Sequence, residues 1–173
     1  MIHPEKIEDV AVFLALAYLL EIESAERYTE LADNMQLHHL VELEQLFRQL
    51  SDYGDKHAEE VITYAGGAAL PTLGTLDFQW EGPEGPETAG IDLISYEMSV
   101  EQALQVALHN EVRGRDFYAN VAEKSPSNEV RKLANEFAQE ENEHVHLLLE
   151  RIEQVTDSEK QMHDDLDPPN MPE

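Results

Sequence analysis

The chain has 173 residues, enough for one domain with a sizeable core, and it contains no cysteine, which excludes disulfides, thiolate metal sites and thiol nucleophiles. Its 37 acidic residues against 11 basic ones give a formal net charge of −26, which argues against binding to nucleic acid or to an anionic membrane surface. No apolar run is long enough to span a membrane and no signal peptide is apparent, so we expect a cytoplasmic protein.

Four segments with helical periodicity follow one another along the chain. Glycines at 66 and 67 end the second segment, and Ser99 opens the third, where Gln102 stands at capping-box spacing. The sequence SPS at 125–127 separates the third segment from the fourth. The predicted helices cover about residues 4–34, 37–65, 99–124 and 128–155.

A segment rich in glycine and proline, about residues 66–98, separates the second and third predicted helices. A connection of this length is unusual as a plain loop and suggests a crossover along a helical bundle. We therefore predict an all-α domain over residues 1–155: a four-helix bundle of two helical hairpins joined by the crossover. Residues 156–173 are polar, acidic and proline-rich, and we predict that they form a disordered tail.

An internal repeat relates the two predicted hairpins. A shift of 90 residues lays the first helix on the third, and a shift of 87 lays the second on the fourth. The aligned pairs are Glu21 with Glu111, Tyr28 with Tyr118, Gly54 with Glu141 and His57 with His144.

The apolar face of each predicted helix is interrupted near its middle by ionisable side chains. These are Glu21, His57, Glu111, Glu141 and His144. A lone carboxylate in a low-dielectric core costs several kcal/mol, so it protonates, pairs or binds a cation. Three carboxylates and two imidazoles at one level of a bundle are hard to explain as packing, and such mixed donors suit Fe, Mn or Zn. Glu141 and His144 lie one turn apart and are able to chelate one ion.

The two halves of the chain resemble a known family. SVEQALQVALHNEVRGRDFYANVA and VRKLANEFAQEENEHVHLLLERI resemble the second half of the rubrerythrin-like branch of the ferritin-like superfamily, whose members are di-iron carboxylate proteins. The marks are a Glu with Gly at +3 and Phe-Tyr at +6 and +7, then Glu-x-x-His on the next helix. LLEIESAERYTELA and LFRQLSDYGDKHAEEV look like the matching first half, so the resemblance covers roughly residues 7–155.

The resemblance implies a ferritin-like four-helix bundle that binds one or two iron ions, with Mn or Zn as alternatives. The metal ligands it implies are Glu21, His57, Glu111, Glu141 and His144. Tyr28 and Tyr118 would lie close to them. It also implies oxidase or peroxidase chemistry toward dioxygen or peroxide, and a homodimer.

The chain departs from the family's pattern at three points. Without cysteine it cannot carry the rubredoxin-like iron domain of full rubrerythrins, so the electron donor is unknown. The Glu that rubrerythrins place three residues after Glu111 is here Gly114, and the Glu expected on the second helix is Gly54. Neither Asp52 nor Asp55 is a ready substitute, because they lie about 200° and 100° around the helix from position 54.

Gly54 has two explanations from the sequence. Either the position is no longer constrained because the metal site is vestigial, or the absence of a side chain there has a function. Glycine in a helix interior costs about 1 kcal/mol relative to alanine. That cost motivates the hypothesis that the missing side chain leaves room for a water, an exogenous carboxylate or a substrate.

Each candidate residue also has a structural alternative. These are a buried ion pair for Glu141 and His144, a salt bridge to Arg115 for Glu111, a hydrogen-bonded core position for His57, and packing for Tyr28 and Tyr118. Two alternative functions follow. One is a non-catalytic helical protein with a vestigial site, used for assembly or partner binding, and the other is iron storage or delivery.

Overall fold

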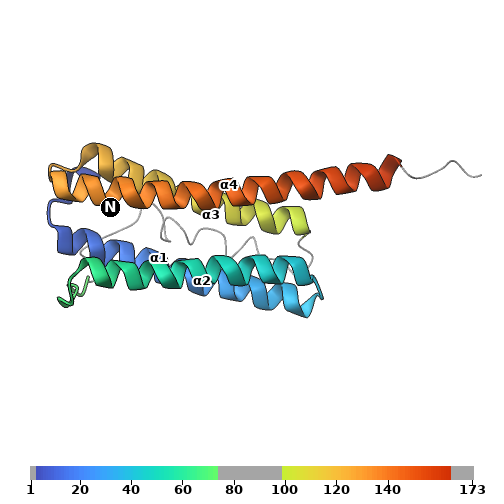
Figure 1. Ribbon diagram of the computed structural model, residues 1–173, viewed down its shortest axis with the longest axis horizontal. Helices are drawn as coiled ribbons and strands as arrows, with labels where there is room; N and C mark the ends of the chain where they lie inside the picture. Colours follow the sequence, from blue (N-terminus) through green and yellow to red (C-terminus); the bar gives the residue numbers. More distant parts are fainter. Residues whose placement is uncertain (1–2, 74–98, 165–173) are drawn as a thin grey trace, which may run out of the picture.

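The protein folds into four helices arranged as two hairpins, in a computed structural model that describes residues 3–73 and 99–164. A short 3₁₀ turn, η1 (Pro4–Lys6), precedes α1 (Val10–Leu37), α2 (Val41–Tyr64), α3 (Val100–Lys124) and α4 (Asn128–Asp164). α1 packs along α2 and α3 along α4 (Figure 1). The described residues contain no strand, so the predicted ferritin-like bundle of two hairpins is confirmed. None of these helices is long and apolar enough to cross a membrane.

The predicted stop and start signals act as expected. Gly66 and Gly67 follow α2 with φ angles of 62° and 78°, the left-handed region that glycine adopts without strain. Ser99 caps α3: its hydroxyl accepts from the Gln102 N–H at 3.2 Å, and the Gln102 side chain accepts from the Ser99 N–H at 2.9 Å. The rest of the predicted crossover, residues 74–98, and residues 165–173 of the predicted tail lie outside the described residues.

The helix boundaries differ most from the sequence prediction at the start of α1 and at the end of α4; α1 also ends at Leu37 and α2 begins at Val41, three and four residues later than predicted. α1 begins at Val10, because Asp9 caps it by accepting from the Ala11 N–H at 2.7 Å, while Pro4 lies in the separate turn η1. α4 continues nine residues beyond Val155 to Asp164, into the segment expected to be a disordered tail. No glycine or proline occurs between 156 and 164, so nothing in the local sequence ends the helix there. Figure 1 shows this end of α4 extending past the other helices.

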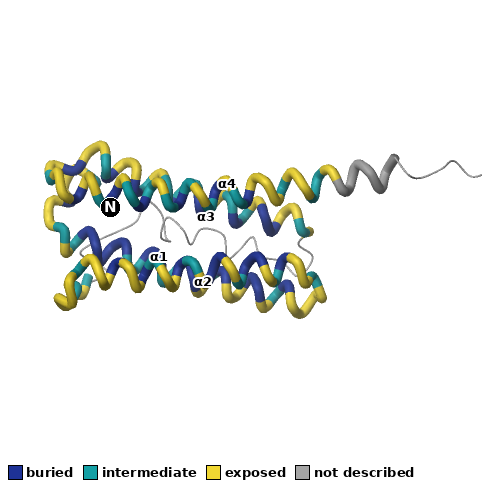
Figure 2. Tube along the Cα trace, viewed as in Figure 1, coloured by how far each residue is buried: buried dark blue, intermediate teal, exposed yellow. Residues whose placement is uncertain are grey.

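Buried residues recur along all four helices (Figure 2). The buried apolar side chains form two clusters, one toward each end of the bundle. The first is built around Phe13, whose ring stacks on Phe137 at 5.7 Å and meets Tyr118 edge-on at 6.2 Å. The second includes Tyr28, which stacks on Phe47 at 6.2 Å. Between them every helix contributes an ionisable side chain, so the polar layer is sealed by apolar side chains on both sides.

Gly54 allows α1 and α2 to approach closely. A Cβ atom at this position would lie 3.0 Å from the Glu21 carbonyl oxygen and 3.1 Å from the Ala25 Cβ, closer than ordinary van der Waals contact. One turn earlier the Ser51 hydroxyl donates to the Ala25 carbonyl at 3.0 Å, which fixes the two helices at this spacing. The hypothesis that the missing side chain leaves room for a ligand is therefore wrong, because α1 fills that space.

We expect Gly54→Ala to destabilise the protein by about 1–3 kcal/mol, although alanine is the better helix former, because the added methyl must push α1 and α2 apart. Urea unfolding of the metal-free protein measures the effect. Asp55→Ala, on the exposed side of the same turn, should change the unfolding free energy by less than about 0.5 kcal/mol. Adding Ala25→Gly to Gly54→Ala should recover part of the loss. A Gly54→Ala variant as stable as the wild type would contradict the close-approach explanation.

Candidate metal centre

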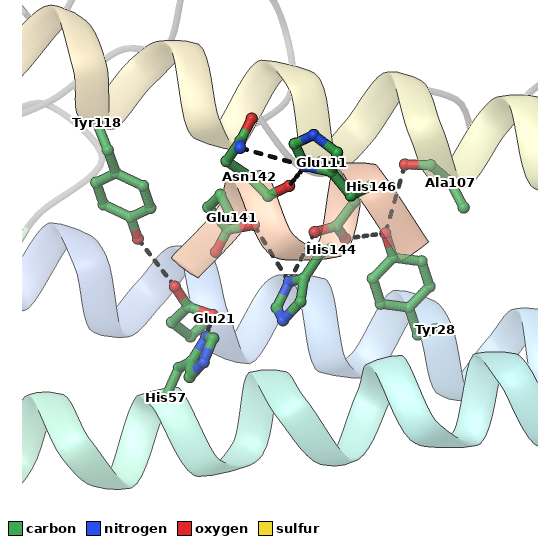
Figure 3. Close-up of polar contacts among 10 residues, drawn as sticks. All are labelled: Glu21, Tyr28, His57, Ala107, Glu111, Tyr118, Glu141, Asn142, His144 and His146. Carbon is green, nitrogen blue, oxygen red and sulfur yellow. Dashed lines mark hydrogen bonds and ion pairs between the residues drawn. The ribbon is translucent and has the colours of Figure 1, made fainter. Parts of the chain in front are cut away.

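The five ionisable residues predicted from the sequence meet in the polar layer between the two apolar clusters (Figure 3). α1 contributes Glu21, α2 His57, α3 Glu111, and α4 both Glu141 and His144. The three carboxylates are buried, with exposures of 3–4%. The two imidazole side chains are slightly more open, at 17% for His57 and 13% for His144. The layer is thus enclosed, with its residual exposure on the histidine side.

Glu21, His57 and Glu141 form the first group able to hold a metal ion. One ligand atom from each lies within 4.8 Å of the other two. The His57 Nδ1 atom lies 3.5 Å from the Glu21 carboxylate. Three different helices from both hairpins therefore supply this group.

Glu111, Glu141 and His144 form the second group under the same distance limit. The His144 Nδ1 atom lies 3.0 Å from Glu111 and 3.5 Å from Glu141. Glu141 belongs to both groups, so its carboxylate stands between two neighbouring candidate positions. Metal–ligand bonds of about 2.0–2.2 Å place opposite ligands roughly 4 Å apart, so each set of donors fits one ion of the Fe, Mn or Zn type.

Two buried tyrosines bind the carboxylates across the gap between the hairpins. The Tyr118 hydroxyl of α3 donates to Glu21 of α1 at 3.0 Å. The Tyr28 hydroxyl of α1 donates to Glu111 of α3, the reciprocal contact in the internal repeat. Each tyrosine ring belongs to an apolar cluster while its hydroxyl reaches the polar layer. Their interpretation as packing residues is thus incomplete, since both also fix the orientation of a candidate ligand.

The buried groups shift one another's ionisation. Burial raises the pKa of Glu111, but hydrogen bonds from His144 and Tyr28 and the charge of His144 outweigh it, so the net pKa lies below its ordinary value. Burial lowers the pKa of His57, but the hydrogen bond and charge of Glu21 outweigh it, so its pKa lies above the ordinary value. Each imidazole of the metal-free layer therefore lies beside a carboxylate, His57 beside Glu21 and His144 beside Glu111.

These contacts bear on the structural alternatives that the sequence left open for the candidate ligands. Arg115, which the sequence offered as an alternative salt-bridge partner of Glu111, instead pairs with Asp116 at 2.8 Å. Asp52 and Asp55 are exposed, so neither takes the place of the carboxylate missing at Gly54. The buried Glu–His pairing proposed as an alternative for Glu141 and His144 is present at 3.5 Å, and the same residues also belong to the second metal group.

Tyr53 was not among the residues predicted from the sequence, but it lies against the candidate metal centre. Its ring stacks on the His144 imidazole at 5.2 Å, and His144 stacks in turn on His57 at 5.3 Å, both nearly parallel. Tyr53 therefore covers one face of the histidine pair. The available signal was its spacing of four residues from His57, which places both side chains on the same side of α2.

Comparisons with known proteins agree with this architecture. The fold and its layer of carboxylates and histidines are those of a ferritin-like protein with candidate metal-binding groups. The sequence model of the Rubrerythrin family matches residues 13–69 and 102–169, so the chain belongs to the rubrerythrin family. A crystal structure of an uncharacterised conserved protein from Magnetospirillum magnetotacticum MS-1 is similar, with a TM-score of 0.69 and 37% identity, over 84% of this chain and 95% of that one. No curated protein matches.

We expect Tyr28→Phe and Tyr118→Phe each to lower the unfolding free energy of the metal-free protein by about 1–3 kcal/mol, because each removes a donor from a buried carboxylate. Denaturant unfolding at neutral pH with a chelator present measures this loss. Tyr18→Phe is the control, since its hydroxyl makes no hydrogen bond to the described residues, and it should be nearly neutral. Equal stability of all three variants would show that the tyrosines act through ring packing alone.

Proposed function

We propose that the chain binds one or two iron ions through Glu21, His57, Glu111, Glu141 and His144. The observation that supports this most directly is the membership of Glu141 in both candidate groups. A carboxylate has two oxygen atoms that each accept a ligand bond, so Glu141 is able to join two neighbouring ions. Burial of the three carboxylates at 3–4% exposure adds to the argument, because a cation offsets the cost of burying them.

The proposed site is less symmetric than a pair bridged by two Glu-x-x-His segments. α4 supplies both Glu141 and His144, whereas α2 supplies only His57, since Gly54 carries no side chain. Each of the two candidate metal groups then has two carboxylates and one imidazole, with Glu141 counted in both. Iron commonly takes more than three ligands, so coordination positions remain that the protein does not fill.

We propose further that the site reacts with dioxygen or peroxide. Two bound iron(II) ions would supply the two electrons that, with two protons, convert hydrogen peroxide to two water molecules. The protein's own part is structural and electrostatic: Tyr28 and Tyr118 hold two carboxylates in place, and the apolar clusters on both sides limit access of bulk water. An external donor would return the electrons, because the chain has no cysteine with which to hold an iron–sulfur centre.

Glu141→Gln should remove most of the metal, because one substitution disrupts both groups. Elemental analysis after anaerobic addition of iron(II) and desalting should show about one or two equivalents in the wild type and at least about tenfold weaker binding in this variant. His57→Ala and His144→Ala should each weaken one group. Glu143→Gln, exposed on the same helix, is the control and should bind as the wild type does. Wild-type protein that retains no iron under these conditions would reject the proposal.

The redox proposal has a separate test. Protein loaded with iron(II) under anaerobic conditions should consume hydrogen peroxide or dioxygen faster than the same concentration of free iron(II) in the same buffer. The remaining iron(II), measured with a chromogenic chelator after rapid mixing, reports the rate. Glu141→Gln should react at the rate of free iron(II). Iron that binds but is oxidised no faster than free iron would leave a storage or delivery role in place of oxidase or peroxidase chemistry.

One observation favours a second candidate function, a non-catalytic bundle with a structural polar layer. In the metal-free arrangement the buried groups already pair with one another, since His144 lies 3.0 Å from Glu111 and Tyr28 donates to the same carboxylate. Such a network needs no metal to satisfy its charges. Under this alternative the wild type would bind no metal. Glu111→Gln and Glu141→Gln would then change only the free energy of unfolding.

A further inference from the structure

A third group of potential ligands lies on the outer side of the candidate metal centre. His57, Glu60 and Glu140 offer ligand atoms that all lie within 4.8 Å of one another. Glu60 is three residues after His57 on α2, and Glu140 directly precedes Glu141 on α4. Glu60 is exposed, while His57 and Glu140 are partly buried, so the group extends from the surface toward the buried layer.

The charges around Glu140 favour a cation at this point. The charged neighbours that act on its carboxylate are His57 and three other carboxylates, Glu60, Glu21 and Glu136. No salt bridge joins Glu60 or Glu140 to a lysine or arginine within the described part of the chain. Repulsion between converging carboxylates is relieved when a cation binds between them.

His57 connects this outer group with the buried one. The same imidazole belongs to the group of Glu60 and Glu140 and to the group of Glu21 and Glu141. A neutral imidazole has one lone pair for a metal ion, so His57 is able to hold an ion in only one of the two positions at a time. An ion held by the outer group and an ion held by His57 in the buried group would therefore exclude each other.

We propose that His57, Glu60 and Glu140 form an outer site for a divalent cation, from which the ion passes to the buried ligands. This inference rests on the proposed function, since it supplies the metal to the same centre. Glu21 and Glu141 are almost fully buried, so an ion reaching them must lose its water ligands. Glu60 and Glu140 would first replace some of the water ligands of the ion at the surface. Glu21 and Glu141 would then replace Glu60 and Glu140 as the ion moves inward.

The rate of cobalt(II) loading into the full-length metal-free protein tests the proposal. Cobalt(II) bound by carboxylate and imidazole has a visible absorption band that reports its arrival by stopped-flow mixing. The test variant is Glu60→Gln/Glu140→Gln, which keeps the shapes of both side chains. The matched control is Glu59→Gln/Glu143→Gln, which removes the same charge from exposed positions of the same two helices.

We expect the test variant to load at least about threefold more slowly than the control, with the final amount of cobalt(II) unchanged. The difference should persist at about 0.5 M salt, where long-range attraction between exposed charges is screened. Equal rates for the two variants would overturn the outer site while leaving the buried centre in place. A difference that disappears at high salt would also overturn it, because general attraction would then be the cause. A wild type that binds no cobalt(II) would overturn the outer site as a general site for divalent cations, while the iron(II) binding test decides the proposed function separately.

Discussion

The burial of three carboxylates in the middle of an apolar bundle is the constraint on which this structure depends. Each ionised carboxylate removed from water must be matched by donors or by positive charge, or its pKa must rise until it is neutral. The surrounding helices supply these partners to the carboxylates. Tyrosines donate from the apolar clusters, histidines approach from the more open side, and all four helices place their ionisable residues at one level. The layer is stable only as a set, because removal of one partner leaves another group uncompensated.

The spacing of the helices differs within and between the hairpins, and the site depends on this difference. Within the first hairpin Gly54 faces the Glu21 carbonyl oxygen and the Ala25 methyl group, so no large side chain separates the two backbones. Between the hairpins the distance is bridged by tyrosine rings and carboxylates. In the internal repeat the position of Gly54 corresponds to that of Glu141. One half of the chain therefore uses this position for close packing and the other uses it for a shared candidate ligand, which accounts for the asymmetry of the centre.

Local patterns predicted much of this, because helices and their polar interruptions are properties of single segments. The periodicity indicated four helices, and the interruptions indicated the five residues that the structure brings together. The role of Gly54 was not predictable, since it depends on the distance to a neighbouring helix. The outer position of Glu60 and Glu140 was hidden for a similar reason: both look like ordinary residues of an acidic surface until α2 and α4 are placed side by side. The length of α4 beyond Val155 was missed because the sequence TDSEKQMHD at 156–164 is polar and has no apolar residues at helical spacing.

The hydrogen-bonded layer and the proposed metal centre are two states of the same side chains. In the metal-free state, against the opposite effect of burial, Glu21 raises the pKa of His57, and hydrogen bonds from His144 and Tyr28 lower the pKa of Glu111. Metal binding requires an unprotonated nitrogen on each imidazole, so a proton held there would be released and the ion would become the positive partner. Without metal, the carboxylates of Glu21 and Glu111 accept hydrogen bonds from the buried tyrosines. The pairing of Glu111 with His144 therefore holds these two side chains together without metal, and the same two side chains belong to one candidate metal group.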